Sequence, residues 1–139
     1  MIARENIHLT LAFLGGADPA KAIAAAKRVK GSQHALPVDE ARFWKKNQIV
    51  WAGPRETPPE LDRLVRSLQL ELYRAEFILE RRPFAAHVTL LRKAREPAEM
   101  PPLPRMAWPV HEFLLVRSLT SASGPTYEPI ARFPLEGVP

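Results

Sequence analysis

The sequence IHLTLAFLGG, at residues 7–16, places an apolar residue at every second position and then two glycines. Alternate residues of an extended chain point to opposite sides, so the apolar residues from Ile7 to Phe13 share one side. His8 and Thr10 lie together on the other side. We predict a β-strand over residues 7–14 that ends at Gly15.

The pattern recurs near the middle of the chain, where residues 86–92 read AHVTLLR. His87 and Thr89 repeat the His-x-Thr spacing of His8 and Thr10, again among apolar residues, and predict a second strand over residues 86–92. Each strand would present one imidazole and one hydroxyl on the same face. If the two strands are neighbours, the four polar groups surround a site suited to a tetrahedral phosphate.

Histidine suits such a site because its ordinary pKa of about 6.5 lets one copy accept a proton while another donates one. Thr10 and Thr89 would hold the non-bridging oxygens of the phosphate. A structural, hydrogen-bonded histidine explains either motif alone, whereas the repeated pair favours catalysis. We expect no metal, because threonine is a poor ligand and neither motif has another His or carboxylate at ligand spacing.

The rest of the chain indicates an α+β domain with antiparallel sheets. Asp18 and Pro19 would start a helix that stops near Gly31. Thr57 to Glu60 resembles a capping box with a proline at the first helical position, before apolar residues at helical spacing. Residues 97–109 contain five prolines and predict a surface connection. Further strands are expected at Pro37–Trp44 and Gln48–Ala52, which would form a hairpin, and at His111–Arg117 and Tyr127–Leu135.

Composition narrows the functional classes. The chain has no cysteine, which excludes disulfides and thiolate chemistry, and its formal net charge of +5 favours a polyanionic partner. It contains neither a glycine-rich phosphate loop nor a run of 18 apolar residues, so we expect no ATP- or NAD-dependent chemistry and no membrane span. Without a leader-like first segment, we expect a cytoplasmic protein. Trp44 and Trp51, in the expected hairpin, favour core or edge positions over base stacking.

The sequence resembles the 2H phosphoesterases, and within them the RNA 2′,3′-cyclic phosphodiesterases formerly called 2′-5′ RNA ligases. The resemblance runs nearly end to end and rests on four stretches: ENIHLTLAFLG (5–15), IVWAG (49–53), RPFAAHVTLLR (82–92) and RSLTSASGPTYEPIARFPL (117–135). It implies a single two-lobed domain over residues 1–139, with antiparallel sheets, outer helices and a groove between the lobes. It also implies that no cofactor is needed.

The resemblance further implies an enzyme that opens RNA 2′,3′-cyclic phosphates to 2′-phosphomonoesters. His8 would donate a proton to the departing 3′ oxygen, His87 would accept one from water, and Arg92 would help bind the phosphate. The expected partner is RNA or a nucleotide with a 2′,3′-cyclic phosphate. Two alternatives stay open: reversible 2′-5′ RNA ligation in the same groove, and a catalytically idle RNA- or nucleotide-binding module.

One departure concerns the beginning of the chain. Family members carry an opening strand and helix before the first motif, whereas seven residues precede His8 here. We therefore expect one lobe to lack a central strand. A gene start placed too late, a domain boundary, and a sheet completed by a second copy of the chain are competing explanations.

Overall fold

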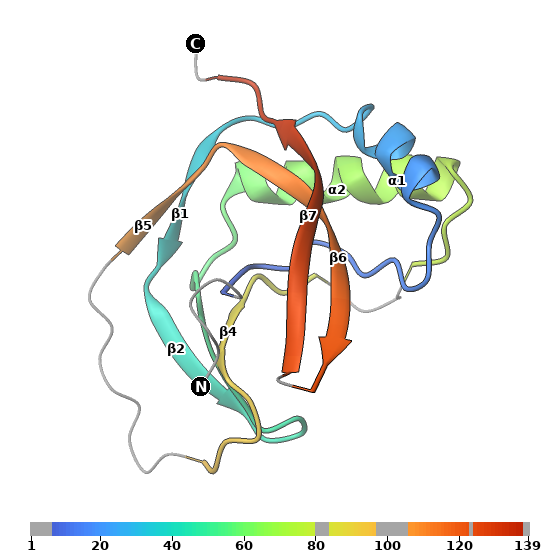
Figure 1. Cartoon of the computed structure of the whole chain (residues 1–139). Helices are drawn as coiled ribbons and strands as arrows, with labels where there is room; N and C mark the ends of the chain where they lie inside the picture. The colour runs from blue at the N-terminus through green and yellow to red at the C-terminus, as the bar shows by residue number, and fades with distance from the viewer. Residues whose placement is uncertain (1–6, 80–83, 97–105, 123, 138–139) are drawn as a thin grey trace.

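The computed structural model describes residues 7–79, 84–96, 106–122 and 124–137, which form two helices and seven strands (Figure 1). The helices and strands are, in chain order, α1 (Pro19–Ala26), β1 (His34–Val38), β2 (Glu40–Trp44), β3 (Ile49–Gly53), α2 (Pro59–Arg74), β4 (Val88–Leu91), β5 (Met106–Val110), β6 (Glu112–Ser121) and β7 (Gly124–Pro134).

The strands form three antiparallel groups, β1–β5, β2–β3–β4 and β6–β7. This arrangement confirms the α+β class and the predicted β2–β3 hairpin, and it pairs the last two predicted strands as β6–β7. In Figure 1 the two helices lie at one end, and the β2–β3–β4 sheet and the β6–β7 ribbon extend away from them. The segment that carries the first His-x-Thr motif passes between the sheet and the ribbon.

The core lies where the apolar face of α2 meets the strands. The apolar residues of α2 that were predicted from their helical spacing are all buried, and the side chain of Leu64 is only 1% exposed. A side chain at Gly31 would place its Cβ 2.9 Å from Leu64 Cδ1, so glycine permits the close approach of the chain to α2. The main cluster of buried residues consists of Leu36, Leu61, Leu64, Val65, Ala86 and Leu135, against which Leu9 packs.

Helix α1 begins at the predicted proline, Pro19, whereas α2 begins at Pro59, one residue after the first helical position that the capping box predicts. Asp18 caps α1 as expected, since its Oδ1 accepts a hydrogen bond from Ala20 N at 3.1 Å. The α-helix ends at Ala26, before Gly31, because the N–H groups of residues 28 and 29 bond three residues back and tighten the chain. The predicted capping box is wrong. Pro58 is the N-cap, and Pro59 holds it in an extended conformation, which leaves Thr57 one residue too early to cap α2.

The strand boundaries also required correction. Residues 7–14 do not form a continuous strand: among them only Leu9 pairs, in an isolated bridge with Val88 of β4. The run predicted over 37–44 divides at Asp39, so that β1 pairs with β5 and β2 with β3. The predicted connection over 97–109 contains β5 in its final part, while residues 97–105 lie outside the described part. A two-stranded ribbon accepts Pro109 because each strand has an unpaired edge.

Candidate active site

The two His-x-Thr motifs lie side by side. Leu9 forms an antiparallel bridge with Val88, the central apolar residue of the second motif. Val88 is buried and Leu9 packs against the core, so this pair faces inward. The polar residues that flank it project to the opposite side. The bridge thus brings the segments that carry His8, Thr10, His87 and Thr89 side by side, whereas the sequence left open whether the two strands are neighbours.

The register of the bridge sets the spacing within this group. Antiparallel pairing at Leu9 and Val88 aligns His8 with Thr89 and Thr10 with His87. The two histidines are then diagonal neighbours, for which Cα separations are about 7–8 Å. Two imidazoles at that spacing leave room for one phosphate between their outer nitrogens. His8 is exposed and the other three residues are half-buried, so the group is open to solvent.

The orientation of the His87 ring follows from its hydrogen bond. His87 Nδ1 lies 2.9 Å from the carbonyl oxygen of Ala85. A carbonyl can only accept a hydrogen bond, so Nδ1 carries the proton that is donated to it. In the neutral ring, Nε2 then holds a lone pair and can accept a proton. The hydrogen bond therefore prepares His87 to act as a base through Nε2.

Each histidine also contacts an aromatic residue from a neighbouring hairpin. The ring of His87 lies edge-on to Trp44 of β2, with centroids 4.7 Å apart. The ring of His8 lies 4.8 Å from that of Tyr127 on β7, in a tilted arrangement. The sequence patterns did not indicate Tyr127 as a site residue, although it lies within the fourth stretch of the family resemblance. Its contact with His8 connects distant parts of the chain, so local periodicity carries no signal for it.

Gly53 at the end of β3 lets the backbone before His87 approach closely. A Cβ built at this position would lie 2.7 Å from the carbonyl oxygen of Ala86, closer than real Cβ atoms come to other atoms. Ala86 precedes His87 directly and is itself buried. Any larger residue at position 53 would therefore displace the backbone that carries the imidazole.

A β-bulge changes the face of Leu91, the residue before Arg92. Trp51 pairs with Thr89 and Val50 pairs with Leu91, so β4 has one more residue than β3 between these pairs. Leu91 therefore shares the face of Val50, opposite to Thr89, which corrects the simple alternation predicted for this strand. Arg92 comes next, in a bend just past the strand, so the register of β4 does not set the face on which it lies. This exposed arginine directly follows the strand and lies at its end.

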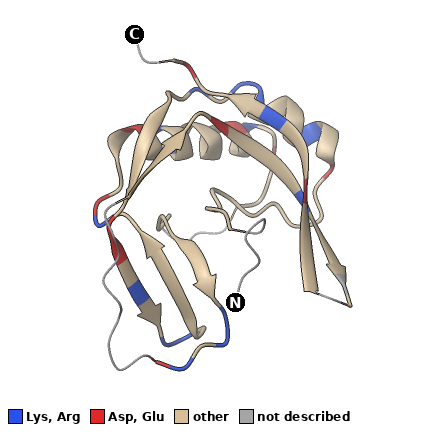
Figure 2. Cartoon of the chain, turned by 60° about the vertical axis from the view of Figure 1, so that its left-hand side comes forward, with Lys and Arg blue, Asp and Glu red and all other residues tan. Residues whose placement is uncertain are grey.

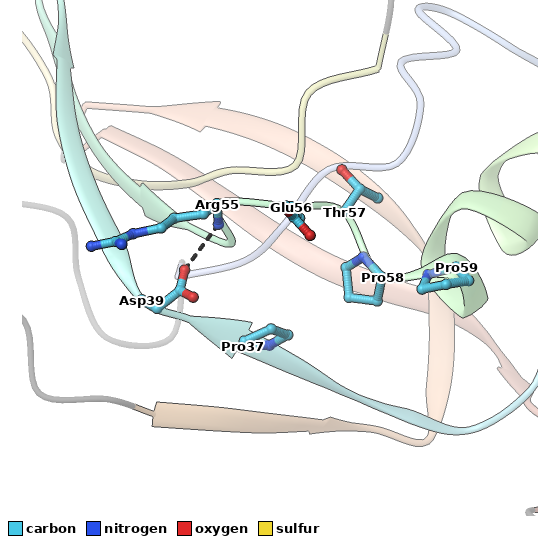
Figure 3. Close-up of a pocket in the computed structure, with 7 residues that line it drawn as sticks. All are labelled: Pro37, Asp39, Arg55, Glu56, Thr57, Pro58 and Pro59. Carbon is cyan, nitrogen blue, oxygen red and sulfur yellow. Dashed lines mark hydrogen bonds between the residues drawn. The ribbon is translucent and has the colours of Figure 1, made fainter.

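A separate pocket lies near the start of α2, away from both motifs (Figure 3). There Arg55 N donates a hydrogen bond to Asp39 Oδ1 at 2.9 Å. The pocket has a volume of about 370 Å³ and is lined by Pro37, Asp39, Arg55, Glu56, Thr57, Pro58 and Pro59. None of the predicted site residues contributes to it. Among the residues that the structure describes, no three His, Cys, Asp or Glu side chains gather as metal ligands would.

Comparison with known proteins connects this geometry to a family. Residues 1–51 match the family described as LigT like Phosphoesterase. The chain is 37% identical to the RNA 2′,3′-cyclic phosphodiesterase of Escherichia coli (strain K12), over 96% of this chain and 78% of that protein. The chain belongs to the RNA 2′,3′-cyclic phosphodiesterase family of 2H phosphoesterases. The family resemblance inferred from the two motifs is therefore confirmed.

Further relatives agree with membership in this phosphodiesterase family. The enzyme of the same name from Geobacillus stearothermophilus is 33% identical, over 99% of this chain and 48% of its own length. The crystal structure of E. coli LigT complexed with 3′-AMP superposes with a TM-score of 0.88 at 34% identity, covering 96% of this chain and 79% of LigT. These matches confirm the predicted fold class. Within the described residues, no helix is long and apolar enough to cross a membrane.

Proposed function

We propose that this chain hydrolyses 2′,3′-cyclic phosphates at RNA ends to 2′-phosphomonoesters, with two histidines as acid and base and without a metal. The observation that carries the proposal is the antiparallel bridge between Leu9 and Val88, because its register puts both imidazoles on one open face. Relatives named RNA 2′,3′-cyclic phosphodiesterase, similar over nearly the whole chain, support the choice of substrate.

His87 acts as the base and His8 as the acid. Nε2 of His87 takes a proton from water while the water oxygen forms a bond to phosphorus. The bond from phosphorus to the 3′ oxygen breaks, and that oxygen takes a proton from the imidazolium of His8. The product carries a 2′-phosphate and a free 3′ hydroxyl. The bond from His87 Nδ1 to Ala85 supports this assignment, because it leaves Nε2 available as the acceptor.

Thr10, Thr89 and Arg92 stabilise the charge that accumulates on the phosphate. In the register of the bridge, each threonine lies across from the histidine of the other motif. Their hydroxyls can donate hydrogen bonds to the two non-bridging oxygens. Arg92 directly follows β4 and adds an exposed positive charge at the end of that strand. These donors act on the phosphate itself, so no cofactor is required for this chemistry.

The experiment is incubation of the purified chain with an RNA that ends in a 2′,3′-cyclic phosphate, in the presence of EDTA. We expect a 2′-phosphomonoester as the product. A 3′-phosphomonoester would contradict the assigned leaving group, and dependence on a divalent ion would contradict the metal-free mechanism. Addition of a second RNA with a 5′ hydroxyl separates hydrolysis from ligation, because ligation joins the two strands. Binding without turnover would instead support an idle module.

A further inference from the structure

Cationic side chains gather at the end of the β2–β3–β4 sheet, in a surface that we call the basic tip. It consists of the turn between β2 and β3, residues 45–48, and the segment after β4, residues 92–96. Ala94 N donates a hydrogen bond to Gln48 O at 3.0 Å, which joins the two segments. The side chain of Ala94 is buried, so the second segment is anchored. Figure 2 shows blue positions at this end of the sheet, which is the end away from the helices.

The basic tip holds most of the net charge of the chain. It contains five cations, Lys45, Lys46, Arg92, Lys93 and Arg95, and a single carboxylate, Glu96, for a net charge of +4, whereas the whole chain carries +5. The five cations are exposed. The ion pair between Lys45 Nζ and Glu96 Oε2, at 3.5 Å, joins side chains that are 76% and 59% exposed, so it restrains Lys45 weakly.

The basic tip continues from the face that carries His87. Lys45 directly follows Trp44, whose ring contacts the imidazole of His87. On the other segment, Arg92 directly follows β4, the strand that begins at Val88, next to His87. Four residues separate His87 from Arg92, and Lys93 and Arg95 lie farther along the chain. These more distal cations can contact other phosphates of the same strand.

The opposite side of the site has no comparable surplus of charge. On the β6–β7 ribbon, Arg117 pairs with Glu128 at 3.3 Å. Arg132 pairs in the same way with Glu112. Each of these cations is matched by a carboxylate. A polyanionic strand that leaves the site is therefore attracted toward the basic tip rather than along the ribbon.

We infer that the basic tip binds the phosphate backbone of a single-stranded RNA on the 5′ side of its cyclic end. This inference rests on the proposed function, which it deepens by naming an RNA strand rather than a free mononucleotide as the preferred substrate. Backbone contacts of this kind carry no sequence information, so the preference concerns strand length and not base identity. Affinity for the strand falls as salt rises, because binding releases counterions from the phosphates.

The test compares two substrates, adenosine 2′,3′-cyclic phosphate and a short single-stranded RNA with a 2′,3′-cyclic phosphate end. The variant Lys45→Gln/Lys46→Gln/Arg95→Gln removes three tip cations and leaves Arg92 in place. We expect kcat/KM on the RNA to fall about tenfold or more at low salt. On the mononucleotide, kcat/KM stays within about twofold. The slope of log kcat/KM against log salt, measured on the RNA, becomes shallower by about 0.7 for each phosphate that the variant no longer binds.

A matched control removes three exposed cations from the helical layer, in Lys27→Gln/Lys30→Gln/Arg63→Gln, so that the net charge changes equally. If the position of the cations matters rather than the total charge, this control variant keeps both the kcat/KM on RNA and the salt slope of the wild type. Equal losses in the two variants would overturn the inference, as would an unchanged RNA activity in the tip variant. If the wild-type chain cleaves neither substrate, the proposed function fails. Fluorescence anisotropy of the same RNA then tests the basic tip, and equal affinity of wild type and tip variant would refute it.

Discussion

The imidazole of His87 lies edge-on to the indole of Trp44, with ring centroids 4.7 Å apart. Trp44 contacts Trp51 on its neighbouring strand, with centroids 4.9 Å apart, and Trp51 is buried. The contact with buried Trp51 thus supports the indole of Trp44 from the core. The contact between this indole and the imidazole of His87 limits the rotation of the imidazole. Together with the hydrogen bond to Ala85, this contact fixes the direction in which Nε2 of His87 points.

Replacing Trp44 with alanine should lower kcat five- to tenfold and leave KM within twofold. The reason is that aromatic contacts are worth about 1 kcal/mol beyond buried area, and here that energy orients the base. Steady-state kinetics on a mononucleoside 2′,3′-cyclic phosphate provides the measurement. Trp44→Phe should restore most of kcat because a ring remains against the imidazole. An alanine variant that folds and keeps its full kcat would show that the contact does not orient His87.

Gly53→Ala should displace the backbone at Ala86 and with it the imidazole of His87. We expect kcat to fall at least tenfold and the free energy of unfolding to drop by about 1–3 kcal/mol, as in other overpacked sites. Urea unfolding and kinetics measure both effects. Gly16→Ala is the control, since a Cβ at Gly16 meets no atom within 4 Å. Normal activity of Gly53→Ala would mean that the backbone adjusts to the added Cβ without moving His87.

Much of this site could be predicted from the sequence because its signal is local. The spacing of histidine and threonine places both groups on one face wherever the strand lies, and the repeat indicates two such strands. The face of Leu91 could not be predicted, because the extra residue of the bulge becomes visible only in the register with β3. The contact between His8 and Tyr127 was also missed, since it depends on how the β6–β7 ribbon packs.

The same distinction applies to the fold. The helix α2 was predicted because five apolar residues at helical spacing dominate its sequence, and all five are buried. The strand β5 was missed because Pro109 argues against a strand. Its pairing partner β1 is distant in sequence, and a two-stranded ribbon tolerates proline at its edges. Patterns within one segment were informative, whereas pairings between distant segments required the structure.

Leu64 should contribute more to stability than any exposed leucine of the same helix. Its side chain is 1% exposed and lies against Gly31, so truncation leaves a cavity that the glycine backbone cannot fill. Leu64→Ala should lower the free energy of unfolding by about 2–5 kcal/mol in urea titrations. Leu70→Ala, at a position that is 48% exposed, provides the comparison and should change it by less than about 1 kcal/mol. Similar losses at both positions would contradict the position of Leu64 in the core.

Arg92 should matter for the reacting phosphate itself, unlike the more distal cations of the basic tip. On a mononucleoside 2′,3′-cyclic phosphate, Arg92→Ala should reduce kcat/KM by about tenfold to a hundredfold, because a charged donor to the phosphate is removed. Arg95→Ala should change it by less than about twofold, since Arg95 lies four residues beyond the end of β4, whereas Arg92 follows the strand directly. Equal effects of the two substitutions would contradict the assignment of Arg92 to the reacting phosphate.

The two histidines should produce a bell-shaped dependence of kcat/KM on pH. At low pH, protonation of Nε2 on His87 removes the base, and at high pH, loss of the proton from His8 removes the acid, so the rate falls on both sides. His8→Ala and His87→Ala should each lower kcat by about 10²–10⁴-fold, the usual contribution of a positioned acid or base. In the residual reaction of His8→Ala, the fall in kcat/KM at high pH should disappear while the fall at low pH remains. In the residual reaction of His87→Ala, the fall at low pH should disappear while the fall at high pH remains. Profiles that keep both limbs in both variants would assign the proton transfers to other groups.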